Sequence, residues 1–199
     1  HNTISLIFAI ASCFFLQIPI VYTIHSMHTS YGGRLNKLWR LLAGWRINTF
    51  IAVSDAAKSD LVRHVRIKDK RIVVVHNSID EKAYTVSERS NSSYVALIIC
   101  VGRLVHETKG QDVLIKALSV IKVRSIEFEC VIVGEGSSRP FLESLIRDLG
   151  LTEKVKLAGA RTDIAELMRE ADLFVLPSRQ EGFGMAILEA MASGVAVLA

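Results

Sequence analysis

The sequence is poor in cysteine, which argues against a disulfide or zinc framework. Only Cys13, Cys100 and Cys130 occur among 199 residues, an odd number without metal or redox spacing. Cys100 and Cys130 lie in apolar, strand-like runs. We therefore predict three reduced core cysteines, as is usual in a cytosolic protein.

Several motifs of common enzyme classes are also missing. There is no G-x-x-x-x-G-K-[ST] phosphate loop, and the stretches GEGSSR (134–139) and GFGMAI (182–187) each lack the third glycine of a dinucleotide fingerprint. No Cys/His pair has zinc spacing, and His25 and His28 have no evident third ligand. We predict no metal site.

Residues 1–33 contain no acidic or basic side chain other than histidine, which leaves two interpretations open. Ile4–Ile24 is an uncharged run of 21 residues, long enough to span a bilayer. No basic region typical of a signal peptide precedes it, and Pro19 divides it. We expect a buried helix at 2–16 and a strand at 18–24, with a membrane segment as the alternative.

Positive charge is concentrated in residues 34–71. The whole chain has a net charge of +4, but ten Lys/Arg against three Asp give this stretch a local charge of +7. Such a stretch suits contact with an anionic membrane or an acidic acceptor. The alternative is an ordinary solvated face.

Strand-like and helical stretches alternate along the chain, which predicts an α/β protein with doubly wound parallel sheets. The candidate strands are near-continuous apolar runs, as in strands buried on both faces. Beyond 18–24 they are 49–54, 71–77, 94–102, 128–134, 154–159, 171–178 and 194–199. The candidate helices beyond 2–16 are 35–45, 56–65, 109–123, 138–149, 163–170 and 184–193, with N-caps at Ser54-Asp55 and Thr162-Asp163.

The polar stretch EKAYTVSERSNSS (81–93) interrupts this alternation and is interpreted as a linker. It separates residues 1–80, part of one α/β domain, from residues 94–199, most of a second. The chain begins at His1 without Met and stops in the strand-like SGVAVLA. We therefore expect a fragment of a longer protein, with the second domain incomplete at its C-terminus.

The first stretch that suggests a ligand-binding site is VGRLVHETKG (101–110). Gly102 allows a tight exit from the preceding strand, and Arg103 and Lys109 are two cations in one predicted strand-to-helix loop. In an open parallel sheet such a loop lies at the carboxyl end, where ligands bind. Two cations near a helix N-terminus suit a diphosphate, although two ordinary surface cations would look the same.

The second candidate ligand-binding stretch is EGFGMAILEAMASG (181–194). Its two glutamates, Glu181 and Glu189, are eight positions apart. If Gly184 opens a helix, Glu189 lies in its first two turns and Glu181 lies before it. In a continuous helix the two Cα atoms would be about 12 Å apart along the axis. That is large for a glycosidase pair, at about 5–9.5 Å. The layout suits a long ligand with a negative centre, such as a nucleotide sugar; a capped surface helix with incidental acids is the alternative.

This stretch resembles the E-x7-E signature of retaining glycosyltransferases of family 4, which have the GT-B fold. Five other segments resemble family patterns in the same order, and the resemblance covers nearly all of residues 19–199. They are FIAVSDAAKSDL (50–61), VVVHNSID (73–80), VGRLVHETKG (101–110), VIVGEGSSRPFLESLIRDLGLTEKVKLAGA (131–160) and ADLFVLPSRQEGFG (171–184). The resemblance implies a GT-B-like fold of two Rossmann-like parallel-sheet domains, the first partly present and the second nearly complete.

The resemblance also assigns catalytic roles. Arg103 and Lys109 would bind the donor diphosphate and stabilise it as it leaves. Glu181 would lie against the transferred sugar and orient it. His25 in YTIHS would reach the sugar from the acceptor domain, although a histidine satisfied at a strand end is the alternative.

The implied donor-binding set is larger. Glu189 would hold the ribose hydroxyls, the glycine turn would offer backbone N–H groups, and Gly134 lies in the strand-end stretch where the base would rest. The full set is Gly102, Arg103, Lys109, Gly134, Gly182, Phe183, Gly184 and Glu189. Two residues depart from the family pattern: Ser78 replaces a usual glycine, and Ala196 stands where proline is common.

The implied reaction moves a sugar from a nucleoside diphosphate, UDP by family frequency, to an acceptor hydroxyl with retention. The leaving phosphate would take the acceptor proton, and neither a metal nor a cofactor would be needed. We expect a carbohydrate or lipid-linked acceptor in cell-surface polysaccharide or glycolipid synthesis, peripheral membrane contact, a place at the cytoplasmic face of the membrane, and no nucleic-acid partner. The alternatives are a non-catalytic fragment that binds nucleotide sugar, or an epimerase- or phosphorylase-like GT-B relative.

Overall fold

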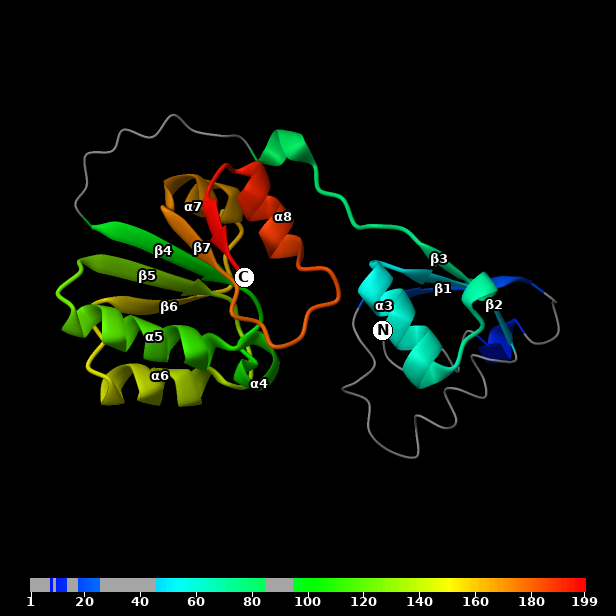
Figure 1. The fold of residues 1–199 in the computed structure, drawn as a ribbon, viewed down its shortest axis with the longest axis horizontal. Coiled ribbons are helices and arrows are strands. Elements are labelled where there is room, and N and C mark those ends of the chain that lie inside the picture. The colour runs from blue at the N-terminus through cyan, green and yellow to red at the C-terminus, as the bar shows by residue number, and fades with distance from the viewer. Residues whose placement is uncertain (1–7, 9, 14–17, 26–45, 85–94) are drawn as a thin grey trace. The chain divides into compact units, whose positions relative to one another are not determined.

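The computed structural model describes residues 8, 10–13, 18–25, 46–84 and 95–199 (Figure 1). It divides into two compact units. The first is His1–Asn77 with Glu181–Phe183, and the second is Ser78–Gln180 with Gly184–Ala199. The predicted helix at 35–45 and residues 85–93 of the predicted linker lie outside the described residues.

The first unit contains a three-stranded parallel sheet in the order β1-β2-β3. Its strands are β1 (Ile20–Ile24), β2 (Ile47–Ala52) and β3 (Ile72–Val74). The central strand β2 carries Phe50 and Ala52, both fully buried. These strands confirm the predictions at 18–24, 49–54 and 71–77, although β3 is shorter than its apolar run.

The uncharged run near the N-terminus holds a strand rather than one continuous helix. β1 occupies its last five residues, and residues 8 and 10–12 are helical. In the described part of the chain, no helix combines the length and the apolar character needed to cross a membrane.

The helix predicted at 56–65 forms in two parts. The α-helix α3 (Asp55–Asp60) runs directly into a π-helical turn, η2 (Leu61–Val65). The hydroxyl of Ser54 accepts a hydrogen bond from the Ala57 amide at 3.1 Å, which confirms the predicted N-cap.

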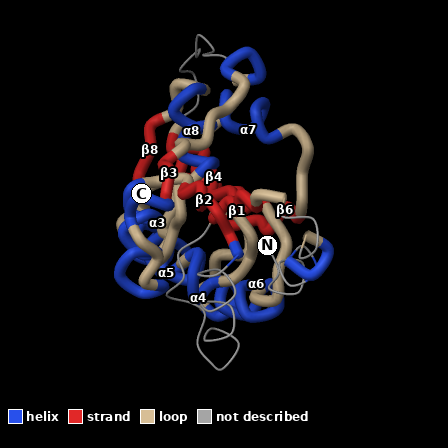
Figure 2. Tube along the Cα trace, turned by 90° about the vertical axis from the view of Figure 1, so that its right-hand side faces the viewer, coloured by secondary structure: helices blue, strands red, loops and turns tan. Residues whose placement is uncertain are grey.

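The second unit contains a five-stranded parallel sheet in the order β6-β5-β4-β7-β8. Its strands are β4 (Ala96–Val101), β5 (Phe128–Val133), β6 (Val155–Gly159), β7 (Leu173–Val175) and β8 (Ala196–Leu198). The helices α5 (Gln111–Val123) and α6 (Arg139–Asp148) cover one face, and α7 (Ile164–Glu170) and α8 (Met185–Ala192) cover the other (Figures 1 and 2). This is the predicted doubly wound arrangement.

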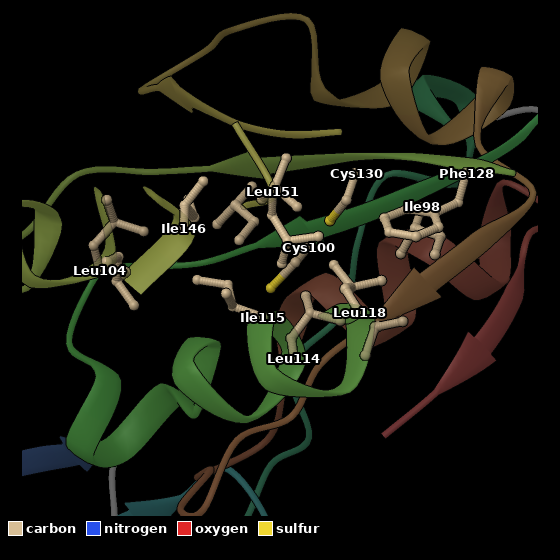
Figure 3. Close-up of a cluster of buried hydrophobic side chains, with 14 residues drawn as sticks. Ile98, Cys100, Leu104, Leu114, Ile115, Leu118, Phe128, Cys130, Ile146 and Leu151 are labelled. Carbon is tan, nitrogen blue, oxygen red and sulfur yellow. The ribbon is translucent and has the colours of Figure 1, made fainter. Parts of the chain in front are cut away.

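The larger core of the second unit lies between the sheet and the helices α5 and α6. Leu114, Ile115 and Leu118 of α5 pack beneath the strand residues Cys100 and Cys130 (Figure 3). Burying each aliphatic side chain stabilises the fold by roughly 1.5–3 kcal/mol. Both cysteines are free and buried, as predicted, and burial raises the pKa of the Cys100 thiol to about 12. Cys13 is free and partly buried against the core of the first unit.

The predicted N-cap at Thr162-Asp163 is confirmed in position but not in its hydrogen bond. Asp163 stands at the N-cap position of α7, but its side chain makes no capping hydrogen bond. Its carboxylate binds the guanidinium of Arg161 instead, with Nε to Oδ1 at 2.7 Å. A charged partner two residues away therefore replaces the backbone amide as the donor.

Candidate functional site

The candidate site lies where the strand order of the second sheet reverses. From β4 the chain adds β5 and β6 on one side and then returns to place β7 and β8 on the other. In open α/β sheets, ligands bind at such a switch point, outside the carboxyl ends of the strands. Two segments leave the sheet here: residues 102–110 after β4 (the β4 loop) and residues 176–180 after β7 (the β7 loop).

The β4 loop is not a simple strand-to-helix connection as predicted. It contains a short helix, α4 (His106–Lys109), and Lys109 is the last residue of that helix. Gly110 follows in the left-handed conformation (φ 67°), and α5 begins at Gln111 rather than at 109. Arg103 is exposed, and the buried side chain of Gln111 donates to its carbonyl at 2.8 Å.

On one side, the β4 loop lies against the residues that follow β5. The Gly102 amide donates to the Val133 carbonyl, and the Leu104 amide to the Glu135 carbonyl, both at 2.9 Å. A Cβ added to Gly134 (φ 139°) would lie 2.0 Å from the Gly102 oxygen. Glycine at 134 is therefore required for the two backbones to approach. A Cβ added to Gly102 itself meets nothing within 4 Å.

On its other side, the β4 loop touches the β7 loop at the backbone. Gly110 is buried, and a Cβ added to it would lie 1.9 Å from the Pro177 carbonyl oxygen. The amides of Arg179 and Gln180 both donate to the Thr108 carbonyl, at 2.8 and 3.3 Å. The two loops therefore have one fixed mutual arrangement.

A salt bridge reinforces this contact. The Arg179 guanidinium forms a bidentate salt bridge with the Asp112 carboxylate, with N–O distances of 2.9 and 3.0 Å. Its Nη1 also donates to the His106 carbonyl at 2.6 Å. The Asp112 side chain is only 8% exposed, against 44% for Arg179. Hydrogen bonds from Arg179 hold the pKa of Asp112 below its ordinary value.

Sequence reasoning missed this pair. Asp112 stands in the first turn of α5, and Arg179 stands two residues before Glu181, so each looks like an ordinary surface charge. The two are 67 residues apart, and no local spacing rule pairs residues at that separation.

The helix α8 begins as predicted. Gly184 is its N-cap residue in the left-handed conformation (φ 77°), and no side chain caps it. Its first amides are thus among the unsatisfied N–H groups that favour an anion at a helix N-terminus. Glu189 lies in its second turn. Burial raises the pKa of Tyr84, and the charge and hydrogen bond of Glu189 raise it further. No sequence signal pointed to Tyr84.

The other predicted residues belong to the first unit. Residues 181–183 are grouped with that unit, where Ser54 Oγ donates to the Gly182 carbonyl at 2.7 Å. The Phe183 ring lies 5.9 Å from the His76 ring, centroid to centroid. These contacts fix the glycine turn through its backbone and through Phe183.

His25 is exposed and directly follows β1, while His28 lies outside the described residues. No cluster of three or more His, Cys, Asp or Glu side chains suited to a metal occurs in the part of the chain that the structure describes.

Two hollows in the second unit lie away from the predicted residues. One, of about 500 Å³, is lined mainly by charged side chains of β5, β6 and α6. The other, of about 210 Å³, is apolar and lies between α5, β7 and the last two residues. No predicted site residue lines either hollow.

In the second unit the structure thus places Gly102, Arg103, Lys109, Gly134, Gly184 and Glu189 on loops that follow β4, β5 and β7, or on α8. This arrangement provides two cations, open glycine backbone and a helix N-terminus. These are the elements that bind phosphate groups in α/β proteins.

Comparison with known proteins identifies the family of the chain. The model of the family "Glycosyl transferases group 1" matches residues 87–199, more than half of the chain, and that of "Glycosyltransferase Family 4" matches residues 1–83. The chain belongs to the group 1 glycosyl transferases.

Individual relatives are longer than this chain. It is 29% identical to an uncharacterized glycosyltransferase of Methanocaldococcus jannaschii, over 92% of this chain and 51% of the relative. It is 31% identical to the lipopolysaccharide core biosynthesis mannosyltransferase LpcC of Rhizobium leguminosarum, over 77% of this chain and 45% of the relative. The chain spans about half the length of the curated relatives it matches.

A solved structure supports the fold. Anabaena HepE, crystallised in complex with UDP and glucose, matches with a TM-score of 0.87 and 25% identity, over 100% of this chain and 57% of that one. The match and the two parallel sheets confirm the predicted fold class, α/β with two Rossmann-like parts of the GT-B type.

The glycine positions give a first prediction. Gly110→Ala should destabilise the protein by at least about 1–3 kcal/mol, because φ is positive and the new Cβ meets the Pro177 oxygen. Gly102→Ala is the matched control and should change stability by no more than about 0.5 kcal/mol. Urea unfolding measures both. Equal effects would mean that the backbone contact is not as tight as described.

The Asp112–Arg179 pair gives a second prediction. Asp112→Asn should cost about 1–3 kcal/mol at neutral pH, because it weakens a largely buried charged hydrogen bond. The native pKa of Asp112 is lowered, so its ionised form stabilises the fold above the unfolded-state pKa, and that contribution is lost as the pH falls through the native pKa. The difference from wild type should therefore shrink in acid. The exposed Asp148→Asn should show neither effect; a cost for Asp112→Asn that does not depend on pH would contradict the pairing.

Proposed function

We propose that this chain belongs to a glycosyltransferase that takes its sugar from a nucleoside-diphosphate donor. The observation that carries the proposal is the switch point of the second sheet, where the β4 loop bears Arg103 and Lys109 next to open glycine backbone. Membership of the group 1 glycosyl transferases supports it.

On this proposal the donor diphosphate binds the β4 loop. The bond between the sugar anomeric carbon and the diphosphate oxygen breaks as the acceptor oxygen attacks, and the acceptor proton passes to the leaving diphosphate. Arg103, Lys109 and the N-terminal amides of α8 stabilise the negative charge that develops there. Glu189 holds the ribose hydroxyls, while Glu181 and His25 orient the sugar.

The finer parts of the proposal are UDP as donor, membership of family 4 and retention of configuration. UDP is supported by the HepE structure, whose complex contains UDP and glucose. Retention is supported by the E-x7-E resemblance at 181–189 and by the family 4 match over residues 1–83. Determining the anomeric configuration of the product by NMR tests retention directly.

The diphosphate assignment gives the third prediction. In the full-length polypeptide, Lys109→Ala should lower kcat by about 10²-fold or more, since it removes a cation from the leaving group. It should hardly change stability, because the side chain is only half buried. Lys156→Ala removes an exposed lysine of β6 and serves as the matched control. Activity of Lys109→Ala within a few fold of wild type would show that the diphosphate binds elsewhere.

The products distinguish the alternatives. Calorimetry with UDP and GDP sugars detects binding, and a turnover assay with an acceptor panel detects transfer. Binding without transfer by the full-length polypeptide would indicate a nucleotide-sugar-binding module. Release of free sugar or sugar phosphate would indicate an epimerase- or phosphorylase-like relative.

We further propose a carbohydrate or lipid-linked acceptor used at the cytoplasmic face of a membrane, in cell-surface polysaccharide or glycolipid synthesis. The name of the relative LpcC, a lipopolysaccharide core mannosyltransferase, supports this acceptor class. So do four exposed cations that follow α3 and form the basic face: Arg63, Arg66, Lys68 and Lys70.

Membrane contact gives the fourth prediction. The full-length polypeptide should sediment with vesicles containing anionic phosphatidylglycerol, and the combined change Arg63→Glu and Arg66→Glu should weaken binding roughly 30-fold, at about 1 kcal/mol per basic residue. Arg147→Glu with Lys156→Glu makes the same charge change in the second unit and should bind like wild type. Binding should fall with added salt. Equal binding by both double variants would contradict the role of the basic face.

A further inference from the structure

The short helix α4 ends at Lys109 but has little within the β4 loop to stabilise it. It contains four residues, too few for a helix to persist by itself in water. Val105 stands at its N-cap position and makes no side-chain capping hydrogen bond, because valine has no polar group for the first amides. Contacts from other parts of the fold must therefore hold α4 in place.

Ser138 supplies the missing cap from another helix. It stands at the N-cap position of α6 and is buried, yet its side chain makes no capping hydrogen bond there. Its Oγ instead accepts a hydrogen bond at 3.0 Å from the His106 amide, the first amide of α4. Its own amide donates to the Leu104 carbonyl at 2.9 Å. Ser138 thus binds the β4 loop through both its hydroxyl and its backbone.

The His106 side chain adds further contacts to α6. Its Nδ1 lies 2.9 Å from Ser138 Oγ, and because that oxygen accepts the His106 amide proton, the hydroxyl proton is available for the ring nitrogen. The ring also stacks on Phe141, with the two centroids 4.3 Å apart. The Glu107 carboxylate lies 3.4 Å from the same nitrogen, but its side chain is 66% exposed. Backbone, polar side chain and ring therefore all fix the first residue of α4 on α6.

Helical hydrogen bonds connect this anchored end of α4 to the end that carries Lys109. The Lys109 amide donates to the Val105 carbonyl at 2.8 Å, and the Gly110 amide donates to the His106 carbonyl at 2.9 Å. The His106 carbonyl also accepts a hydrogen bond from Arg179 Nη1. The backbone of Lys109 is therefore fixed between α6 and the β7 loop.

We propose that Ser138 is a positioning residue for glycosyl transfer: it caps α4 in place of Val105 and, through His106, holds Lys109 in its orientation at the leaving diphosphate. The proposal rests on the diphosphate role of Lys109 in the proposed function. A cation stabilises charge that develops in the transition state most effectively when it is oriented beforehand. A displacement of about 1 Å, caused by a change away from the reacting atoms, can cost about 10²-fold in rate.

Ser138→Ala gives the fifth prediction. It removes the acceptor of the His106 amide and the partner of Nδ1, while the stacking on Phe141 remains. In the full-length polypeptide, kcat should fall by about 10-fold or more. The donor KM should stay within about three-fold, because the lost interaction acts in the transition state. Steady-state kinetics measures both. Ser144→Ala is the matched control on α6, at a hydroxyl that donates to Asp148 of the same helix, and should leave kcat unchanged.

A double-mutant cycle tests whether the effect acts through Lys109. If Ser138 orients that lysine, adding Ser138→Ala to Lys109→Ala should lower kcat by no more than about a further two-fold. Effects that multiply would show independent roles and overturn the inference. An unchanged kcat in Ser138→Ala, beside a defective Lys109→Ala, would overturn the inference and leave the diphosphate site standing. Wild-type activity of Lys109→Ala would overturn the diphosphate assignment and the positioning role together.

His106→Phe provides a second test, which applies even where Ser138→Ala does not fold. It keeps a ring for Phe141 and the backbone amide for Ser138, and it removes the Nδ1 contact. It should lower kcat by about three-fold or more, the effect of losing one hydrogen bond, and it should add nothing to Lys109→Ala. Urea unfolding verifies that the variant is folded. Wild-type kcat in folded His106→Phe would rule out positioning through the His106–Ser138 contact.

Discussion

The backbone contact between the β4 loop and the β7 loop is the constraint on which the candidate site depends. Gly110 lies so close to the Pro177 carbonyl that no other residue fits there without a shift. The Arg179–Asp112 pair and the two amides that donate to Thr108 hold the same contact from the polar side. The placement of Lys109, one residue before Gly110, is therefore set by the β7 loop as much as by its own strand.

The second unit consists of an apolar core and of polar loops at one edge of its sheet. Parallel strands and helices on both faces bury aliphatic side chains, and the carboxyl ends of the strands present glycines and charges. Burying a charge costs free energy. For Asp112 this cost is offset by the bidentate salt bridge with Arg179. The glycines serve different purposes, since Gly110 and Gly134 allow backbone contact whereas Gly102 leaves open space.

Much of this fold could be predicted from the sequence, because near-continuous apolar runs mark buried parallel strands. Local signals also worked at Ser54, whose hydroxyl caps α3, and at Gly184, which starts α8. At Asp163 they located the N-cap residue of α7 but not its hydrogen bond, because the carboxylate binds Arg161 instead. The pair Arg179–Asp112 could not be predicted, because it joins residues that only the folded chain brings together. The assignments of donor-contacting residues stay predictions.

The buried cysteines have a consequence for the chemistry of the folded protein. Cys100 and Cys130 lie inside the larger core, and burial disfavours their thiolate forms. Because the thiolate is the reactive species, both sulfurs are inert to oxidants and alkylating reagents while the sheet is closed. Only an opening of the β4–β5 region exposes the two thiols. Their chemical modification therefore reports unfolding of the second unit.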